Sequence, residues 1–324
     1  MHFAVASFFF AYKVPAVRPR NLAPHSSITA AEENELLAKA RGDAGPLGRN
    51  ALSKLLQAHQ SSLAAVIRIL VGHPKDLQDV LQEALVEAFT NLESSATLPF
   101  SSWLRGLAVQ KSGEFLALQR KWRPAAQLAV QEYCAATETT LDVVNTFKEE
   151  GFAFDAKAHV SFCFTAVGRA LPMEEQFVVV LVDVLGLSQK ETARVLRIND
   201  DSLTRFLANG RTNLELLFGR LCGLVDVKNP CDLCRGLRAV APENVRGVDP
   251  DTFGLDSGSA EERLHRRLKI VSEADLDAGP THGLHDFLFE LMSQNEANRE
   301  TPKEHDEHLP TAPSRWEDLQ TFNN

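Results

Sequence analysis

Two cysteines spaced as C-x-x-C, Cys231 and Cys234, are the residues whose types and spacing most directly suggest chemistry. Thiolates at this spacing can bind zinc, and they can also form a redox-active pair. A zinc site needs further ligands. Four candidates lie near the pair in the sequence: Cys222, His265, His282 and His285. A zinc site, a redox-active pair and a turn without chemical function all stay open as interpretations.

The rest of the sequence offers no catalytic motif. It contains no G-x-x-x-x-G-K-S/T loop, no G-x-G-x-x-G, no H-E-x-x-H and no G-x-S-x-G. The five cysteines are an odd set without the spacing of a disulfide framework, which fits a reducing compartment. We therefore expect a cytoplasmic protein that is not an enzyme.

A second group of polar residues lies on one face of a predicted helix, at residues 75–92. Its members are carboxylates and an amide at three- and four-residue spacings: Asp76, Asp79, Gln82, Glu83 and Glu87. Like charges at this spacing destabilise a helix slightly, and no lysine compensates them, so the pattern is not tuned for stability. The face is either a binding surface or an ordinary solvated acidic face.

A third group combines aromatic, amide and basic side chains over residues 103–123. Opening a nucleic-acid duplex needs a pocket for an unstacked base and cations along the freed strand. The candidates are Trp103, Arg105, Gln110, Lys111, Arg120, Lys121, Trp122 and Arg123. The alternatives are a core position for Trp103 and a basic helix end that complements the helix dipole.

The elements that must position these groups are helices. Apolar residues recur at three- to four-residue spacing, and no alternating pattern of strands occurs. The predicted helices cover residues 52–70, 75–92, 101–119, 156–170, 173–185, 188–196, 201–224, 260–274 and 283–295, with a short one near 141–147. The sequence therefore predicts an all-α fold.

The first three of these helices resemble region 2 of bacterial RNA polymerase sigma factors of the extracytoplasmic-function type. Asp76, Asp79, Val80, Gln82 and Glu83 match a D-x-x-D-V-x-Q-E core, and residues 99–104 match P-F-x-x-W-L. The resemblance implies that Asp76, Asp79, Gln82 and Glu83 bind core RNA polymerase. It also implies that Trp103, Arg105, Gln110, Lys111, Arg120 and Lys121 melt promoter DNA. Gln110 and Arg105 depart from the family's usual asparagine and tyrosine.

Residues 171–196 resemble region 4 of the same family, with Leu171-Pro172 and the motif D-V-x-G-L-S at 183–188. Ser188 and Glu191 can form a capping box, and Asp200 or Asp201 can cap the next helix. The resemblance implies a helix-turn-helix that contacts promoter DNA through Ser202, Thr204, Arg205, Asn209 and Arg211. Several lysines and arginines that are usual in the family are missing from the second helix of this helix-turn-helix. We therefore expect the protein to bind the upstream promoter element weakly or to recognise a different sequence there.

The predicted organisation has two small helical domains with extensions. The boundaries are an N-terminal extension (1–47), a region 2-like domain (48–123), a linker (124–155), a region 4-like domain (156–224) and an acidic, partly disordered C-terminal extension (225–324). The net charge is −9, but Lys and Arg equal Asp and Glu over residues 1–224. The acidic excess therefore lies in the extension and does not argue against DNA binding by the rest. The apolar start of the chain is expected to be a flexible extension or to follow a misplaced start codon.

The sequence thus predicts a sigma factor whose partners are core RNA polymerase, promoter DNA and a regulatory protein such as an anti-sigma factor, without a membrane or a required cofactor. Two alternatives remain. One is a degenerate sigma-like regulator that binds polymerase or a partner without initiating. The other is a zinc or thiol sensor based on Cys231 and Cys234.

Overall fold

A computed structural model describes residues 28–43, 45–128, 154–274 and 281–298. Within these ranges the regular elements are all helices, which confirms the all-α prediction, and the β-bridge found there is an isolated one between Cys222 and Cys231. None of the helices in the described part of the chain is long and apolar enough to cross a membrane. The predicted short helix near residues 141–147 lies outside the described residues.

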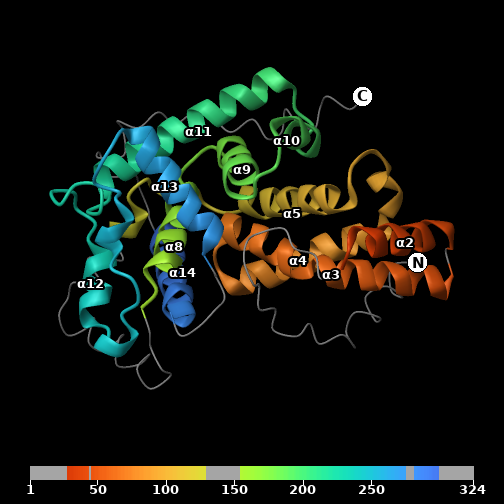
Figure 1. The fold of residues 1–324 in the computed structure, drawn as a ribbon, viewed down its shortest axis with the longest axis horizontal. Helices are drawn as coiled ribbons and strands as arrows, with labels where there is room; N and C mark the ends of the chain where they lie inside the picture. Colours follow the sequence, from red (N-terminus) through yellow and green to blue (C-terminus); the bar gives the residue numbers. More distant parts are fainter. Residues whose placement is uncertain (1–27, 44, 129–153, 275–280, 299–324) are drawn as a thin grey trace.

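The first half of the described chain forms four helices, shown in red to gold in Figure 1: α2 (Ala30–Gly42), α3 (Pro46–Val71), α4 (Pro74–Thr90) and α5 (Phe100–Ala117). A 3₁₀ turn at Leu92–Thr97 connects α4 to α5. Helix α3 ends at Gly72, which adopts a positive φ of 91°, and Pro74 occupies the first turn of α4. The two helices therefore fold back on each other and pack against α5.

Helix α2 lies in the segment that the sequence predicted to be an extension. Its N-terminus is a capping box, in which Thr29 accepts from the backbone N–H of Glu32 and Glu32 accepts from that of Thr29. His59 Nε2 of α3 contacts a carboxylate oxygen of Glu33 at 2.9 Å, and Arg41 donates to Ser95 at 2.6 Å. The helix is thus attached to the bundle by polar contacts and by its half-buried Leu36, Leu37 and Ala40, which pack against the core, although none of its side chains is fully buried.

The second group of helices comprises α8 (Ala156–Gly168), α9 (Met173–Val179), α10 (Gln189–Leu196) and α11 (Asp200–Leu221). Helix α9 continues as a π-helical turn, η2, at Val180–Val184. Ser188 caps α10 by accepting from the Glu191 N–H, as expected, but the Glu191 carboxylate bonds elsewhere. Asn199, rather than Asp200 or Asp201, caps α11, accepting from the Ser202 N–H at 2.7 Å.

The C-terminal part adds α12 (Leu233–Val240), short 3₁₀ turns at Glu243–Val245 and Pro250–Phe253, α13 (Ala260–Glu273) and α14 (Thr281–Ala297). Figure 1 shows α12, α13 and α14 gathered around α8. His159 of α8 and His285 of α14 are both buried, with ring nitrogens 3.1 Å apart, and Phe162 stacks on His285. Residues 225–274 and 281–298 are therefore an integral layer of the fold.

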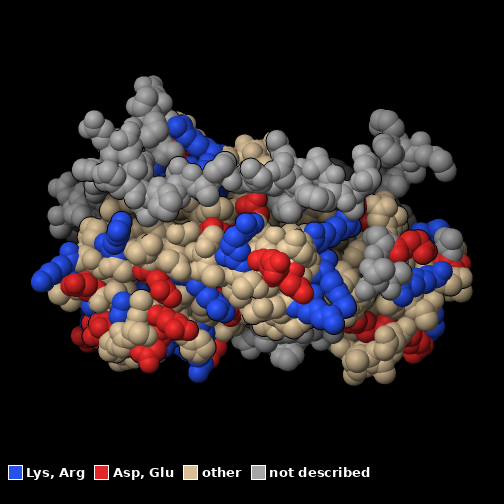
Figure 2. Space-filling model, turned by 90° about the horizontal axis from the view of Figure 1, so that it is seen from above, with Lys and Arg blue, Asp and Glu red and all other residues tan. Residues whose placement is uncertain are grey.

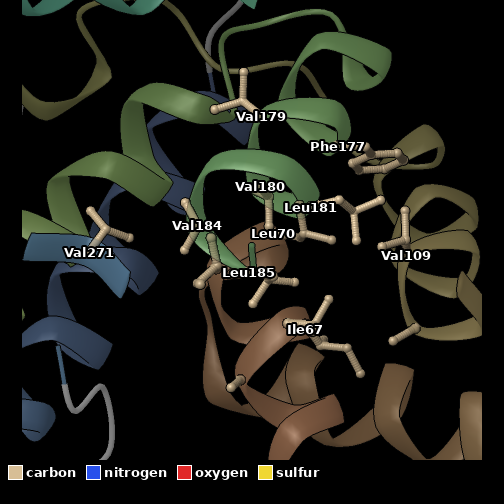
Figure 3. Close-up of a cluster of buried hydrophobic side chains, with 14 of the residues drawn as sticks. Ile67, Leu70, Val109, Phe177, Val179, Val180, Leu181, Val184, Leu185 and Val271 are labelled. Carbon is tan, nitrogen blue, oxygen red and sulfur yellow. The ribbon is translucent and has the colours of Figure 1, made fainter. Parts of the chain in front are cut away.

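The hydrophobic core runs without interruption through both groups of helices and into α13. Figure 3 shows where they meet: Ile67 and Leu70 of α3 and Val109 of α5 lie around Leu181 of η2, and Val271 of α13 lies on the other side, next to Val184. Each of these side chains is almost completely buried. The division of the chain into two domains rests on the resemblance and stays a prediction. The shared hydrophobic core joins the two groups of helices that this division would separate.

Helices α9 and α11 cross at Gly210. From the sequence alone, this glycine is only a residue of low helix propensity. A β-carbon at this position would lie 2.8 Å from Val179 Cγ2 and 3.1 Å from the Glu175 carbonyl oxygen. We expect Gly210→Ala to lower the free energy of unfolding by about 1–2 kcal/mol because Val179 is buried and cannot move aside freely. Gly219→Ala is the matched control, since the same helix has open space there; it should stabilise by about 0.5–1 kcal/mol. Denaturant unfolding measures both, and a stabilising Gly210→Ala would contradict the close crossing.

Candidate functional site

The acidic face of α4 is the part of the predicted site that the structure leaves open to solvent. Asp79, Gln82 and Glu83 are exposed, whereas Val80 is buried in the core. Asp76 is half-buried near the end of α3. Burial raises the pKa of its carboxyl, although His73 and Arg169 act in the opposite direction. The helix thus presents two exposed carboxylates and an amide on one surface, with its apolar side fixed against α3 and α5.

Two predicted DNA-contacting residues of α5, Trp103 and Arg105, are buried. The Trp103 ring packs 5.6 Å from the Phe100 ring, centroid to centroid, as the core alternative anticipated. Burial lowers the pKa of Arg105, while the carboxylates of Glu191 and Glu33 oppose that shift. Neither side chain is available to a DNA strand in this arrangement.

The element that covers this end of α5 is α10, the first helix of the α10–α11 pair. Ser102 of α5 donates to the Glu191 carboxylate of α10. A β-carbon on Gly106 would lie 3.2 Å from Val195 Cγ1 and 3.9 Å from Val195 Cβ. The small residue therefore permits the close approach of α10 to α5. We call this contact the α5–α10 contact.

The other predicted residues of this group remain accessible to different degrees. Gln110 and Lys111 are half-buried, and both donate to the Glu114 carboxylate, at 2.9 and 2.8 Å. Burial alone would lower the pKa of Lys111, but the bond to Glu114 and nearby carboxylates outweigh it and raise the pKa. Arg120 and Lys121 are exposed just after α5. Exposed cations thus follow the end of α5, while its beginning is covered by α10.

Trp122 and Arg123, which follow these cations, are held within the fold. The Arg169 guanidinium lies 4.5 Å above the Trp122 ring, and Arg169 also donates to the Val71 carbonyl. Arg123 forms an ion pair of 2.7 Å with the buried Glu296 of α14. Both residues therefore join α5 to the rest of the protein rather than extending a basic surface.

The predicted DNA-reading residues lie along α11 and differ in their freedom. Arg205, Thr204 and Asn209 are exposed, and Ser202 is half-buried at the helix start. The Thr204 hydroxyl donates to the Asp200 carbonyl, and the Arg205 guanidinium lies 5.1 Å from the Phe206 ring. Arg211 is exposed but bound by Asp183 of η2 through two hydrogen bonds of 2.9 and 2.6 Å. Of the two predicted arginines, only Arg205 extends without a carboxylate partner among the described residues.

Three further exposed arginines near this helix pair, Arg194, Arg197 and Arg220, were not among the predicted DNA contacts. Arg197 occupies the turn between α10 and α11 in a left-handed conformation, with φ 55° and ψ 41°. The sequence could have pointed to this position, because turns of this kind commonly place a glycine where a positive φ is required, and here an arginine stands there. On the face seen in Figure 2, Lys and Arg lie among Asp and Glu instead of forming one continuous basic patch.

The cysteine pair lies at the start of α12 and faces two other cysteines. Cys234 is in the helix, Cys231 directly precedes it, Cys222 follows α11, and Cys163 is in α8. The proposed histidine ligands are elsewhere: His285 packs against His159, and His265 is exposed on α13. The side chain of His282 lies outside the described residues. In the described part of the chain, no group of three or more His, Cys, Asp or Glu residues is placed to hold a metal ion. The zinc interpretation therefore gains no support.

These features define an all-α protein with an exposed acidic helix face and a pair of helices joined by a short turn. No protein-family model matches the chain. The chain is similar to the ECF RNA polymerase sigma factor SigM of Mycobacterium tuberculosis, in strains Erdman and H37Rv. The identity is 27% over 188 residues, covering 56% of this chain and 83% of each relative. This similarity supports a distant relationship to ECF sigma factors.

Proposed function

We propose that this chain is a sigma factor that binds core RNA polymerase and directs it to promoters in the cytoplasm. The observation that carries the proposal is the face of α4, where Asp79, Gln82 and Glu83 are exposed together on one side of the helix. The distant similarity to ECF sigma factors supports the same function. Core polymerase is the proposed partner of this face, and Asp76, half-buried beside it, would contribute at its edge.

Promoter contact is proposed in two places. Gln110, Lys111, Arg120 and Lys121 would follow the opened strand, and Ser202, Thr204, Arg205 and Asn209 would contact the duplex as part of a helix-turn-helix. Because Trp103 and Arg105 are buried, they could reach DNA only after the packing around the start of α5 opens, and the α5–α10 contact is the part of that packing made by the α10–α11 pair. We therefore propose that the described arrangement is a closed form that opens when polymerase or promoter DNA binds.

The α10–α11 pair offers a direct test of DNA binding, because its two predicted arginines differ in their surroundings. We expect Arg205→Ala to reduce the slope of log affinity against log salt by about one unit, since a free cation can neutralise a phosphate. Arg211→Ala should change the slope little, because Asp183 already neutralises that guanidinium. Binding to a promoter fragment over a salt series measures both variants. Equal changes in the two slopes would contradict the assignment of Arg205.

The deciding experiment for the function is run-off transcription by core RNA polymerase with the added chain, on fragmented DNA from the source genome. New discrete transcripts are expected, and their start sites would identify the promoter elements. A protein that co-migrates with polymerase without yielding transcripts would instead fit the degenerate regulator. An anti-sigma partner stays a prediction.

A further inference from the structure

Four cysteines from three parts of the fold gather where α8, α11 and α12 meet. They are Cys163, Cys222, Cys231 and Cys234. Their charges influence one another: Cys222, Cys163 and Cys231 each act on the pKa of Cys234. The sequence pattern indicated only the C-x-x-C pair, because Cys163 and Cys222 are distant from it along the chain. We call this group the thiol cluster.

Within the thiol cluster, Cys222 and Cys231 face each other directly. They form an isolated parallel β-bridge, in which Gly223 N–H donates to the Cys231 carbonyl at 2.7 Å and Cys231 N–H donates to the Leu221 carbonyl at 2.9 Å. Backbones paired in this way lie about 4.8 Å apart. That spacing falls within the Cα–Cα range of about 4.4–6.8 Å that a disulfide requires. Both sulfurs are reduced in the structure.

A buried cation lies against the first of these sulfurs. Arg267 of α13 is 2% exposed, and its Nη2 donates to Cys222 Sγ at 3.3 Å. The guanidinium also lies 3.9 Å from the centre of the Phe218 ring. Among the ion pairs of the described residues, none links Arg267 to a carboxylate, and the groups that act on its charge are the cysteines.

A buried guanidinium without a counter-charge is costly, so its surroundings favour an anion beside it. The Cys222 sulfur is the group that accepts a hydrogen bond from this guanidinium. Burial raises the pKa of Cys231 to about 11 and raises those of Cys163 and Cys234 as well. Thiolates rather than thiols are nucleophiles, and a cation beside a cysteine favours its reaction. The cluster thus has one sulfur in contact with a buried cation and a second cysteine paired with it through the backbone.

We propose that Cys222 and Cys231 form a reversible disulfide in response to a hydroperoxide. The Cys222 thiolate attacks a peroxide oxygen, the O–O bond breaks, and hydroxide leaves, giving a sulfenic acid at Cys222. The Cys231 sulfur then attacks the Cys222 sulfur, and the sulfenic oxygen leaves as water with the proton of the Cys231 thiol. For hydrogen peroxide, two thiols are oxidised, one peroxide is reduced, and two waters form.

Oxidation would turn the sulfur that accepts from Arg267 into part of a disulfide. A disulfide sulfur cannot carry a charge that balances the guanidinium, so the packing of α13 against α8 and α11 should weaken. The expected readout is faster amide hydrogen exchange in α13 of the oxidised protein, with little change in α2 or α4. The thiol cluster would in this way couple the redox state to the contact between the C-terminal layer and α11.

The test uses the full chain, reduced and then treated with limiting hydrogen peroxide. Trypsin cleaves after Lys228, between the two cysteines, so the disulfide would join residues 221–228 to residues 229–235 in a non-reducing digest. Alkylation before digestion would label Cys234 and leave Cys231 linked, and dithiothreitol would release the cross-link. We expect Cys222→Ser to slow peroxide consumption of thiols at least about tenfold, since the attacking sulfur is lost.

Three controls keep the outcome clear. Cys231→Ser should leave Cys222 as a sulfenic acid that a dimedone probe traps, which distinguishes a lost partner from a misfolded protein. Cys134→Ser, which removes a cysteine that the proposed reaction does not use, should leave the cross-link unchanged. A cross-link at other cysteines, the absence of any cross-link, or one metal ion per chain released by Cys222→Ser would each overturn the proposal.

Discussion

An engineered disulfide across the α5–α10 contact is expected to abolish transcription initiation reversibly. Gly106 and Val195 suit this design because a β-carbon on Gly106 would lie 3.9 Å from Val195 Cβ, and disulfides require about 3.8 Å between these atoms. The substitution of Val195 also removes the Cγ1 atom that would crowd the new side chain. If promoter opening needs Trp103 and Arg105, the oxidised Gly106→Cys/Val195→Cys protein cannot expose them.

The measurement is run-off transcription with the oxidised double variant, before and after dithiothreitol. We expect a loss of at least about tenfold on oxidation, because the open state is removed from the equilibrium, and full recovery on reduction. The two single variants, oxidised in the same way, control for effects on the native cysteines. Unchanged transcription by a protein shown to be cross-linked would mean that the closed arrangement initiates, and that Trp103 and Arg105 have structural roles only.

Charge reversal on α4 is expected to separate polymerase binding from stability. Asp79 and Glu83 are exposed and four residues apart, so they repel each other on the helix surface. Replacing Glu83 with arginine removes that repulsion but also the attraction between Glu83 and Lys111 of α5, so the free energy of unfolding should change by no more than about 0.5 kcal/mol. The same change should weaken association with core polymerase by about 2–5 kcal/mol, if Glu83 meets a cation there.

The two quantities can be measured on one preparation of Glu83→Arg, by thermal unfolding and by co-migration with core polymerase. Asp256→Arg is the control, because Asp256 is an exposed carboxylate far along the chain, in the turn before α13. It should leave polymerase binding intact. Binding that is retained in Glu83→Arg would show that the acidic face is an ordinary solvated surface, which was the alternative from the sequence.

The sequence predicted most helices because their apolar stripes are long and regular, as in α3, α4 and α11. Helix α2 was missed although its capping signal, Thr29 followed by Glu32, is present, because glycine and proline after it favoured an extension. Helix α12 is short and begins within the C-x-x-C pair. A metal-binding or redox motif accounts for that stretch of sequence equally well, so the sequence did not predict a helix there. Local patterns of this kind do not say whether a short segment is helical until its packing partner is known.

Only those parts of the candidate site that lie within a single helix were predictable from the sequence. The exposed residues of α4 follow from the spacing of charges along one helix. The burial of Arg105 does not, because it depends on α10, more than eighty residues later in the chain. The close approach at Gly106 and the thiol cluster are likewise long-range results of packing. Arg211 shows the same limit: its charge was visible in the sequence, but its neutralisation by Asp183 was not.

The shared hydrophobic core bears on how this chain can be dissected. A fragment that stops at residue 128 would expose Ile67 and Leu70, because η2 and α8 now pack against α3. A fragment that begins at residue 154 would uncover the opposite side of the same layer. Neither half would have a complete hydrophobic core of its own. Assays on truncated fragments would therefore report on proteins whose core residues are exposed to solvent. Function in this protein is best mapped by point substitutions in the intact chain.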